Sequence, residues 1–385
     1  MFVLLAVALS IYGLINFYVL RRGAQALGEY STAKLVFMAA FIAMTLAYPL
    51  GRVLMSLGRN SLSSPFIMAG SFHMVVMLYG FIGAVLIDLV RLLNAFFHFL
   101  PRSFSSRSSS AGLVLFLAVA GITVLSIAAG AYNAVRPRTV ELDLAISKKA
   151  GGMERLTIVV ASDLHFGTLV GRSRLEKVVD RINALDPDVI FLPGDIVDET
   201  VTAKDEVEFS AIMRMLRAPL GVFAVPGNHE FYSGLERNLA CLRACGIMVL
   251  EDEAIGVAGA FVLVGRRDPS SLAPMEPRLL IRDILAKHGF DDRLPVILLD
   301  HQPAHLEEAS RAGVDLQLSG HTHAGQLFPL DLINRMVWEL NWGYLRKGDT
   351  QYYVTSGVGT WGPPVRTGSR PEIVRIHLTF GEDGK

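Results

Sequence analysis

Four long apolar segments lie in the first 135 residues, and charged residues are sparse within them. A helix needs about 20 apolar residues to cross the hydrocarbon core of a bilayer, and each segment is long enough. The pattern therefore predicts transmembrane helices at about 1–20, 35–55, 66–93 and 112–135. No basic residue precedes the first apolar run and Arg21-Arg22 follow it, which favours a retained helix over a cleaved signal peptide.

A different pattern begins near residue 155. Short apolar runs such as LTIVVAS, DVIFLP, GVFAV, PVILL and DLQLS are separated by stretches of helical character. Alternating strands and helices predict an α/β domain, and continuous apolar runs predict strands that are covered on both faces. We therefore expect a transmembrane region over 1–135, a juxtamembrane linker over 136–154 and an α/β domain over 155–380.

Charge also separates the two regions. Residues 1–150 carry 12 Lys and Arg against 4 Asp and Glu, whereas residues 151–385 carry 24 against 32. The α/β region is acidic and lacks the basic stripe of a nucleic-acid-binding surface, so we expect no nucleic-acid partner. Cys241 and Cys245 are the only cysteines, too few for a Cys-based zinc site, and we expect them to be small buried residues on one helix.

Basic residues in the loops between the apolar segments predict an orientation. Six lie on one side of the membrane and four on the other, and the side with more Lys and Arg is normally cytoplasmic. We therefore expect a multi-pass protein of the cell (inner) membrane whose α/β domain is extracytoplasmic. The six are Arg21, Arg22, Lys34, Arg91, Arg102 and Arg107, and the four are Arg52, Arg59, Arg136 and Arg138.

Polar side chains follow five of the predicted strands, at the edge where open α/β sheets place their sites. Taken singly, each could be a helix cap or a buried hydrogen-bonding group. Taken together, imidazoles and carboxylates without a competing thiolate suit Mn, Fe or Zn, and burying them unpaired would be costly. We therefore predict a dinuclear metal site. The residues are Asp163 and His165, Asp195 and Asp198, Asn228 and His229, His301, and His321 and His323.

The order D-x-H, G-D-x-x-D, G-N-H-E, H and G-H-x-H resembles that of the calcineurin-like metallophosphoesterase family over about 155–380. The resemblance implies a four-layer αββα sandwich with two mixed sheets. It also implies roles: Asp163, His165 and His323 would hold one metal, Asn228, His301 and His321 the second, and Asp195 would bridge them. His229 would be the catalytic general acid or charge stabiliser. Asp198 is better suited to orienting a neighbouring residue than to binding metal, and Gly194, Gly227 and Gly320 are expected to permit tight turns.

The expected chemistry is hydrolysis of a phosphodiester or a pyrophosphate. Two divalent ions about 3.5–4 Å apart clamp the phosphoryl oxygens and generate a hydroxide that attacks phosphorus in line. His229 then offers a proton to the leaving oxygen. We expect Mn²⁺, with Fe or Zn as the alternatives.

Two features point to a lipid-linked substrate. One is the membrane tether, and the other is the aromatic and apolar stretch 327–346, which includes Trp338 and Trp342. Aromatic residues of this kind favour membrane interfaces, although the stretch could instead pack on the domain. Arg366 and Arg370 are candidates for contacting phosphate or, equally, solvated surface residues.

Three further readings stay open at this stage. The segment GHTHAGQ after four spans is similar to a branch described as transmembrane proteins with a metallophosphoesterase domain, related to UDP-2,3-diacylglucosamine pyrophosphatases of lipid A synthesis. A non-catalytic metal-containing membrane scaffold is a second reading. A transporter or sensor is the third, for which His73 and Asp88 are the main intramembrane polar residues.

Overall fold

A computed structural model shows two compact units, Met1–Ala131 and Tyr132–Lys385, which are described separately. The structure describes residues 2–28, 30–58, 60–101, 104, 110–198, 203–271, 277–289 and 293–381. Arg59, Arg102 and Arg107, which entered the charge count for orientation, lie outside the described residues.

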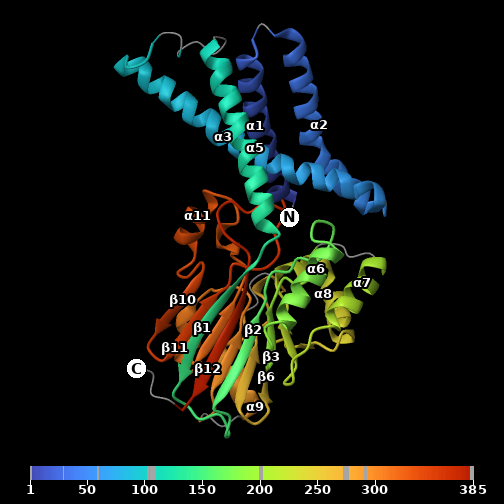
Figure 1. Ribbon diagram of the computed structural model, residues 1–385, viewed down its shortest axis with the longest axis vertical. Coiled ribbons are helices and arrows are strands. Elements are labelled where there is room, and N and C mark those ends of the chain that lie inside the picture. Colours follow the sequence, from blue (N-terminus) through green and yellow to red (C-terminus); the bar gives the residue numbers. More distant parts are fainter. Residues whose placement is uncertain are drawn as a thin grey trace. The chain divides into compact units, whose positions relative to one another are not determined.

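The N-terminal unit is built from long helices (Figure 1). They are α1 (Phe2–Ala26), α2 (Ser31–Ser56), α3 (Asn60–Phe97) and α5 (Ser110–Ala134), whose last turn belongs to the second unit. Among the described residues, three helices, α2, α3 and α5, are long and apolar enough to cross a membrane, against four predicted spans. The first predicted span lies in α1, which continues through Arg21 and Arg22.

A buried polar cluster joins three of these helices. His73 Nε2 of α3 lies 2.8 Å from Asn16 Oδ1 of α1 and 3.1 Å from Thr45 Oγ1 of α2. Interhelical hydrogen bonds of this kind hold membrane helices together. Asp88 forms an ion pair with Arg22 at 2.5 Å, so both polar residues noted in the sequence have partners within the helical unit.

The second unit contains two mixed six-stranded sheets. The strand order is β1-β12-β2-β3-β4-β5 in the first sheet and β10-β11-β9-β8-β7-β6 in the second. Strands β2 to β5 are parallel, as are β7, β8, β9 and β11. The strands are β1 (Arg138–Ile146), β2 (Arg155–Val160), β3 (Val189–Pro193), β4 (Val222–Val225), β5 (Met248–Val249), β6 (Glu253–Val257), β7 (Phe261–Gly265), β8 (Val296–Leu299), β9 (Leu316–Ser319), β10 (Gly343–Lys347), β11 (Thr350–Val354) and β12 (Glu372–Phe380).

Helices cover the outer face of each sheet, and the inner faces pack on one another (Figure 1). Leu175 and Val178 of α6 pack against Val159 of β2, and Ile281 of α9 packs against Val262 of β7. The predicted αββα sandwich is therefore confirmed. Its helices are α6 (Arg172–Asn183), α7 (Ala203–Met213), α8 (Asn228–Ala244), α9 (Ile281–His288), α10 (Leu306–Arg311) and α11 (Leu330–Val337).

Strand β1 lies in the segment 136–154, for which the sequence predicted a linker. It pairs in parallel with β12 from Arg138↔Glu372 to Ile146↔Phe380. Its apolar residues alternate with polar ones, and Leu144 and Ile146 reach the core between the sheets. The strand is at an edge and its partner is at the far end of the chain, so the local pattern alone gave a weak signal.

The core between the sheets predicts a stability effect. Phe261 of β7 is fully buried there, so Phe261→Ala should lower the free energy of unfolding by about 3–5 kcal/mol through lost burial and a residual cavity. Val207→Ala on α7 is the control, because Val207 is 71% exposed and should change it by less than about 0.5 kcal/mol. Denaturant unfolding followed by tryptophan fluorescence measures this unit alone, since all three tryptophans belong to it. Equal denaturation midpoints for the two variants would contradict the packing.

Candidate metal centre

The polar residues predicted from the sequence meet at the carboxyl ends of parallel strands in both sheets. Asp163 and His165 follow β2, Asp195 follows β3, and Asn228 opens α8 directly after β4. From the second sheet, His301 follows β8, while His321 and His323 follow β9. The site therefore straddles the two sheets, and each sheet contributes imidazoles to it.

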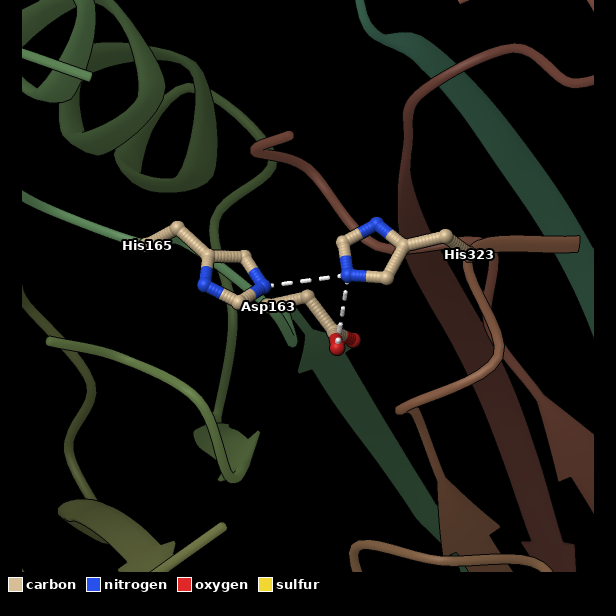
Figure 2. Close-up of side chains that lie close together, drawn as sticks. All are labelled: Asp163, His165 and His323. Carbon is tan, nitrogen blue, oxygen red and sulfur yellow. Dashed lines mark hydrogen bonds and ion pairs between the residues drawn. The ribbon is translucent and has the colours of Figure 1, made fainter. Parts of the chain in front are cut away.

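One group of ligand atoms consists of Asp163, His165 and His323, all buried. The two Nε2 atoms of the histidines lie 3.0 Å apart, and His323 Nε2 lies 3.4 Å from Asp163 Oδ1. Figure 2 shows the three side chains pointing toward one another from the loops after β2 and β9. Their ligand atoms lie within 4.8 Å of one another, which is close enough to share one ion.

A second group consists of Asp195, His301 and His321, with Asn228 beside it. His301 Nε2 lies 3.1 Å from Asp195 Oδ2 and 3.2 Å from Asn228 Oδ1. His321 Nδ1 lies 2.9 Å from Asn228 Oδ1. Asp195 Oδ2 is also 3.9 Å from His165 Nε2 of the first group, so its carboxylate lies between the two groups.

The atoms of the second group fit a cation. His301 Nδ1 lies 2.8 Å from the Pro193 carbonyl, which can only accept, so this nitrogen carries a proton and Nε2 faces the oxygens of Asp195 and Asn228. Two oxygen acceptors that converge on Nε2 in a buried site need positive charge beside them, either as a second proton on His301 or as a metal ion bound by the neutral ring. Burial alone would lower the pKa of His301, but the carboxylate of Asp195 raises the pKa well above its usual value, which is the same demand for a cation.

The remaining histidines are suited to be neutral ligands. Burial lowers the pKa of His165 to about 4 and that of His321 to about 3, and it lowers the pKa of His323 well below its usual value. A neutral imidazole keeps the lone pair that a metal requires. In the described part of the chain, none of the metal-ligand groups includes a cysteine, so the donor set is nitrogen and oxygen. Such a set suits Mn, Fe or Zn.

His229 lies at the edge of this arrangement, in the first turn of α8. Its Nδ1 is 2.8 Å from Asp198 Oδ1, and its backbone N–H donates to Asp195 Oδ1 at 2.9 Å. Burial would lower the pKa of His229, but the hydrogen bond to Asp198 and the nearby charge of Asp195 raise it above its usual value. His229 can therefore hold a proton beside the site, and Asp198 fixes the orientation of its ring.

The backbone at the site is strained. Asp163, His165, Asp195, His321 and His323 all adopt positive φ, between 49° and 70°. Residues other than glycine rarely adopt this conformation, and it persists where surrounding structure enforces it, often at functional sites. It also means that the segment from His321 to His323 is not extended. This explains why the two histidines lie in different groups.

Glu230 is the residue whose contribution the sequence did not reveal. Its buried carboxylate accepts backbone N–H groups from Asp195 at 3.1 Å, Ile196 at 2.7 Å, Val197 at 2.8 Å and Gly227 at 2.7 Å. It therefore fastens the loop after β3 to the start of α8. The position in G-N-H-E was visible in the sequence, but its four backbone partners could be seen only in the fold.

Two glycines at the site provide room for ligands. A Cβ at Gly320 would collide with the hydroxyl of Ser162 and the carboxylate of Asp163, and a Cβ at Gly227 would collide with the carboxylate of Asp195. Both were expected to permit tight turns, yet neither has a positive φ, unlike Gly194 at 87°. Gly227 and Gly320 let backbone approach the carboxylates closely.

A cavity of about 420 Å³ opens onto the metal-ligand groups. Trp338, Trp361, Tyr232 and Leu330 supply aromatic and apolar surface to the cavity, which His229 and other polar residues of the site also line. Of the predicted substrate contacts, only Trp338 is in the described lining, where its ring lies 5.5 Å from that of His321. Tyr232 and Trp361 were not predicted, although Tyr232 lies only two residues after the motif G-N-H-E.

The other predicted substrate contacts lie elsewhere. Arg366 is 1% exposed, and its guanidinium donates to the carbonyls of Ser356, Gly357 and Gly359 while Nη2 lies 3.1 Å from His323 Nδ1. These contacts leave it no donor for a substrate in the cavity. Trp342 donates to Glu372 at 3.0 Å, and it lines a separate pocket together with Arg370.

Comparisons with known proteins agree with this site. The family model described as calcineurin-like phosphoesterase matches residues 156–325. An uncharacterized metallophosphoesterase of Aquifex aeolicus is 34% identical over 259 residues, covering 66% of this chain and 97% of that protein. A Danio rerio protein described as a transmembrane protein with metallophosphoesterase domain is 33% identical over 276 residues, covering 67% of this chain and 61% of that protein. An uncharacterized metallophosphoesterase of Helicobacter pylori strain J99 is 33% identical over 245 residues, covering 63% of this chain and 64% of that protein. The chain thus spans less than two thirds of the last two relatives.

Glu230→Gln should reduce metal binding. The amide keeps the shape of the side chain but places an NH₂ group against backbone donors, so part of the four-bond anchor is lost. We expect metal affinity to fall about 10–100-fold, as when a group that orients metal ligands is removed. The measurement is metal titration of the purified protein. Glu236→Gln on the exposed face of the same helix is the control, and an unchanged affinity in Glu230→Gln would refute the anchoring role.

Gly320→Ala should displace Asp163. The added methyl group has no space, so the carboxylate or the histidine loop must move, and a shift of about 1 Å at a reacting centre can cost about 100-fold in rate. We expect lower metal content by elemental analysis and a comparable loss of phosphodiester turnover. Gly171→Ala is the control, because a Cβ there meets nothing within 4 Å. Full metal content in Gly320→Ala would show that the close approach is dispensable.

Proposed function

The chain belongs to the calcineurin-like phosphoesterase family, and from that premise we propose that it is a membrane-anchored hydrolase of phosphodiester or pyrophosphate bonds. The observation that supports the activity is the pair of neighbouring ligand groups at the carboxyl ends of the strands, with the carboxylate of Asp195 3.1 Å from His301 and 3.9 Å from His165. The three helices that are able to cross a membrane support the anchoring.

We assign the ligands according to the two groups. Asp163, His165 and His323 hold one divalent ion, and Asn228, His301 and His321 hold the second. The carboxylate of Asp195 would be shared between the two ions, because it lies between the two groups and offers two oxygens and a negative charge. When bound, the two ions polarise the phosphoryl oxygens and lower the pKa of a water molecule, and we expect Mn²⁺ with Fe or Zn as alternatives.

The protein's own groups orient the phosphate and supply the proton. Asn228 and His229 form the first turn of α8, where the helix dipole favours an anionic group. His229 lines the cavity, is held by Asp198 and has a raised pKa, so it is the group suited to donate a proton to the leaving oxygen. The intact set of ligand groups speaks against the scaffold reading, in which the catalytic chemistry would have been lost.

The substrate that fits best is a lipid-linked phosphate. The wall made by Trp338, Trp361 and Leu330 gives an organic group an apolar surface beside the metal-ligand groups. The same chain carries helices that are able to cross a membrane, which favours a substrate held in lipid. On the Lys and Arg count, we place the catalytic unit outside the cytoplasm. That orientation disfavours a cytoplasmic nucleotide sugar such as UDP-2,3-diacylglucosamine, which therefore serves as the competing substrate in the test.

His229→Ala should separate substrates by their leaving group. An alkoxide needs protonation as it departs, so turnover of an alkyl phosphodiester should fall about 10²–10⁴-fold. p-Nitrophenolate leaves without a proton, so turnover of bis-p-nitrophenyl phosphate should fall much less. The measurement is kcat for both diesters with detergent-purified protein and added manganese. Equal losses on both would remove His229 from the role of acid.

Two further assays complete this test, one with the variant Asp195→Asn and one with lipid substrates. Asp195→Asn should abolish turnover of every substrate together with metal binding. A lipid-linked diester and diacylated UDP-glucosamine are assayed in parallel. Preference for the second would replace our substrate assignment with the lipid A reading, and the absence of turnover with metal bound would refute the proposed activity.

A further inference from the structure

Helix α11 presents three different faces. One side borders the cavity of the metal centre, which is lined by Leu330, Asn334 and, directly after the helix, Trp338. Asp331 and Arg335 line a second pocket of about 330 Å³. The third face, which we term the α11 apolar face, is made of Leu332, Ile333, Met336 and Val337, which recur at helical spacing.

The α11 apolar face is open to solvent. Leu332 is 53% exposed, Ile333 56%, Met336 87% and Val337 66%, and the preceding Phe328 is 54% exposed. In the described part of the chain no other element covers these side chains. A contiguous group of large exposed apolar residues marks an interaction surface and not ordinary surface scatter.

The second pocket is lined by basic groups. Arg138, Arg335 and Arg370 line it together with Trp342, whereas Asp331 is its one acidic lining residue. We call these three residues the arginine pocket. Arg138 is paired with the buried Glu372 at 3.1 Å, while Arg335 lies 3.9 Å from Asp331. The pocket is therefore net positive and suits anionic phosphate groups.

The chain itself places this surface near a bilayer. Asn133 lines the arginine pocket and donates to the carbonyls of Arg366 and Ser369, and it lies in the last turn of α5, a helix that is able to cross a membrane. Tyr132 is 60% exposed, and the guanidinium of Arg136 lies 3.8 Å from the centre of its ring. Tyrosine and arginine at the end of an apolar helix mark the membrane–water boundary.

We propose that the α11 apolar face and the arginine pocket form a docking surface for a bilayer of anionic phospholipids, with the apolar side chains among the acyl chains and the arginines at the lipid phosphates. Apolar residues beside cations are the composition of helices that lie in the plane of an interface. Docking would turn the cavity wall of Leu330 and Trp338 toward lipid. In this respect the inference rests on the proposed lipid-linked substrate, whereas the docking itself requires no turnover.

The experiment uses the full chain in nanodiscs, with no substrate present. Met336→Trp places a reporter on the α11 apolar face, and Val207→Trp, on an exposed residue of α7, is the matched control. Lipids with brominated acyl chains should quench the added tryptophan at 336 and not the one at 207. In nanodiscs that contain phosphatidylglycerol, Arg335→Glu and Arg370→Glu should each reduce the ratio of docked to undocked protein at least about fivefold.

Each outcome decides the proposal. Quenching at 336 that depends on anionic lipid and on the arginines supports it. Quenching that is equal in phosphatidylcholine alone refutes the role of the arginine pocket. Quenching no greater than at 207 overturns the docking surface, as does cross-linking of 336 between two chains, which would make this face an interface between copies.

Turnover distinguishes this inference from the proposed function. Ile333→Glu and Arg370→Glu should raise KM for a lipid-linked diester at least about fivefold while kcat for bis-p-nitrophenyl phosphate stays unchanged. If quenching occurs but no diester is cleaved, the docking surface stands and the proposed function fails. If the soluble diester is cleaved but no quenching occurs, the proposed activity stands and the docking surface fails.

Discussion

This structure depends on one constraint: buried electron-pair donors that converge need a positive charge between them. His301 Nε2 lies 3.1 Å from Asp195 Oδ2 and 3.2 Å from Asn228 Oδ1. Without a cation, this grouping would cost several kcal/mol in a protein interior. The sandwich places the carboxyl ends of strands from both sheets at one edge, so each sheet supplies ligands. A single sheet would offer only half of them.

The ligands are held in place by backbone, and this requires strain and compensation. His321 and Asp195 adopt left-handed conformations that cost free energy in isolation. Glu230 offsets part of this cost, because its carboxylate binds the N–H groups of the loop that carries Asp195. The same carboxylate binds the N–H of Gly227 at the start of α8, so one buried charge orients a ligand from each of two strands. Stability and metal geometry are therefore coupled at this residue.

The features that could be predicted from the sequence are those that depend on neighbouring residues. Apolar runs identified the strands, and the polar residues after them identified the groups that converge, since parallel strands bring their carboxyl ends to one edge. Strand β1 was not predicted, because its partner β12 is more than 200 residues away. Arg366 was a candidate for contacting phosphate or, equally, a solvated surface residue, but its guanidinium is buried and donates to carbonyls between Ser356 and Gly359. Such side-chain-to-backbone contacts leave no periodic signal, so only the fold reveals them.

Helix α11 connects the metal centre to the surface that we propose contacts lipid. Asn334 on its cavity face donates to the carbonyl of Thr322 at 2.7 Å, between His321 and His323. The helix is therefore bonded to the loop that carries His321 and His323. The proposed contact of its apolar face with a bilayer would act on this same eight-residue helix, so the side that meets lipid and the side that borders the cavity belong to one element.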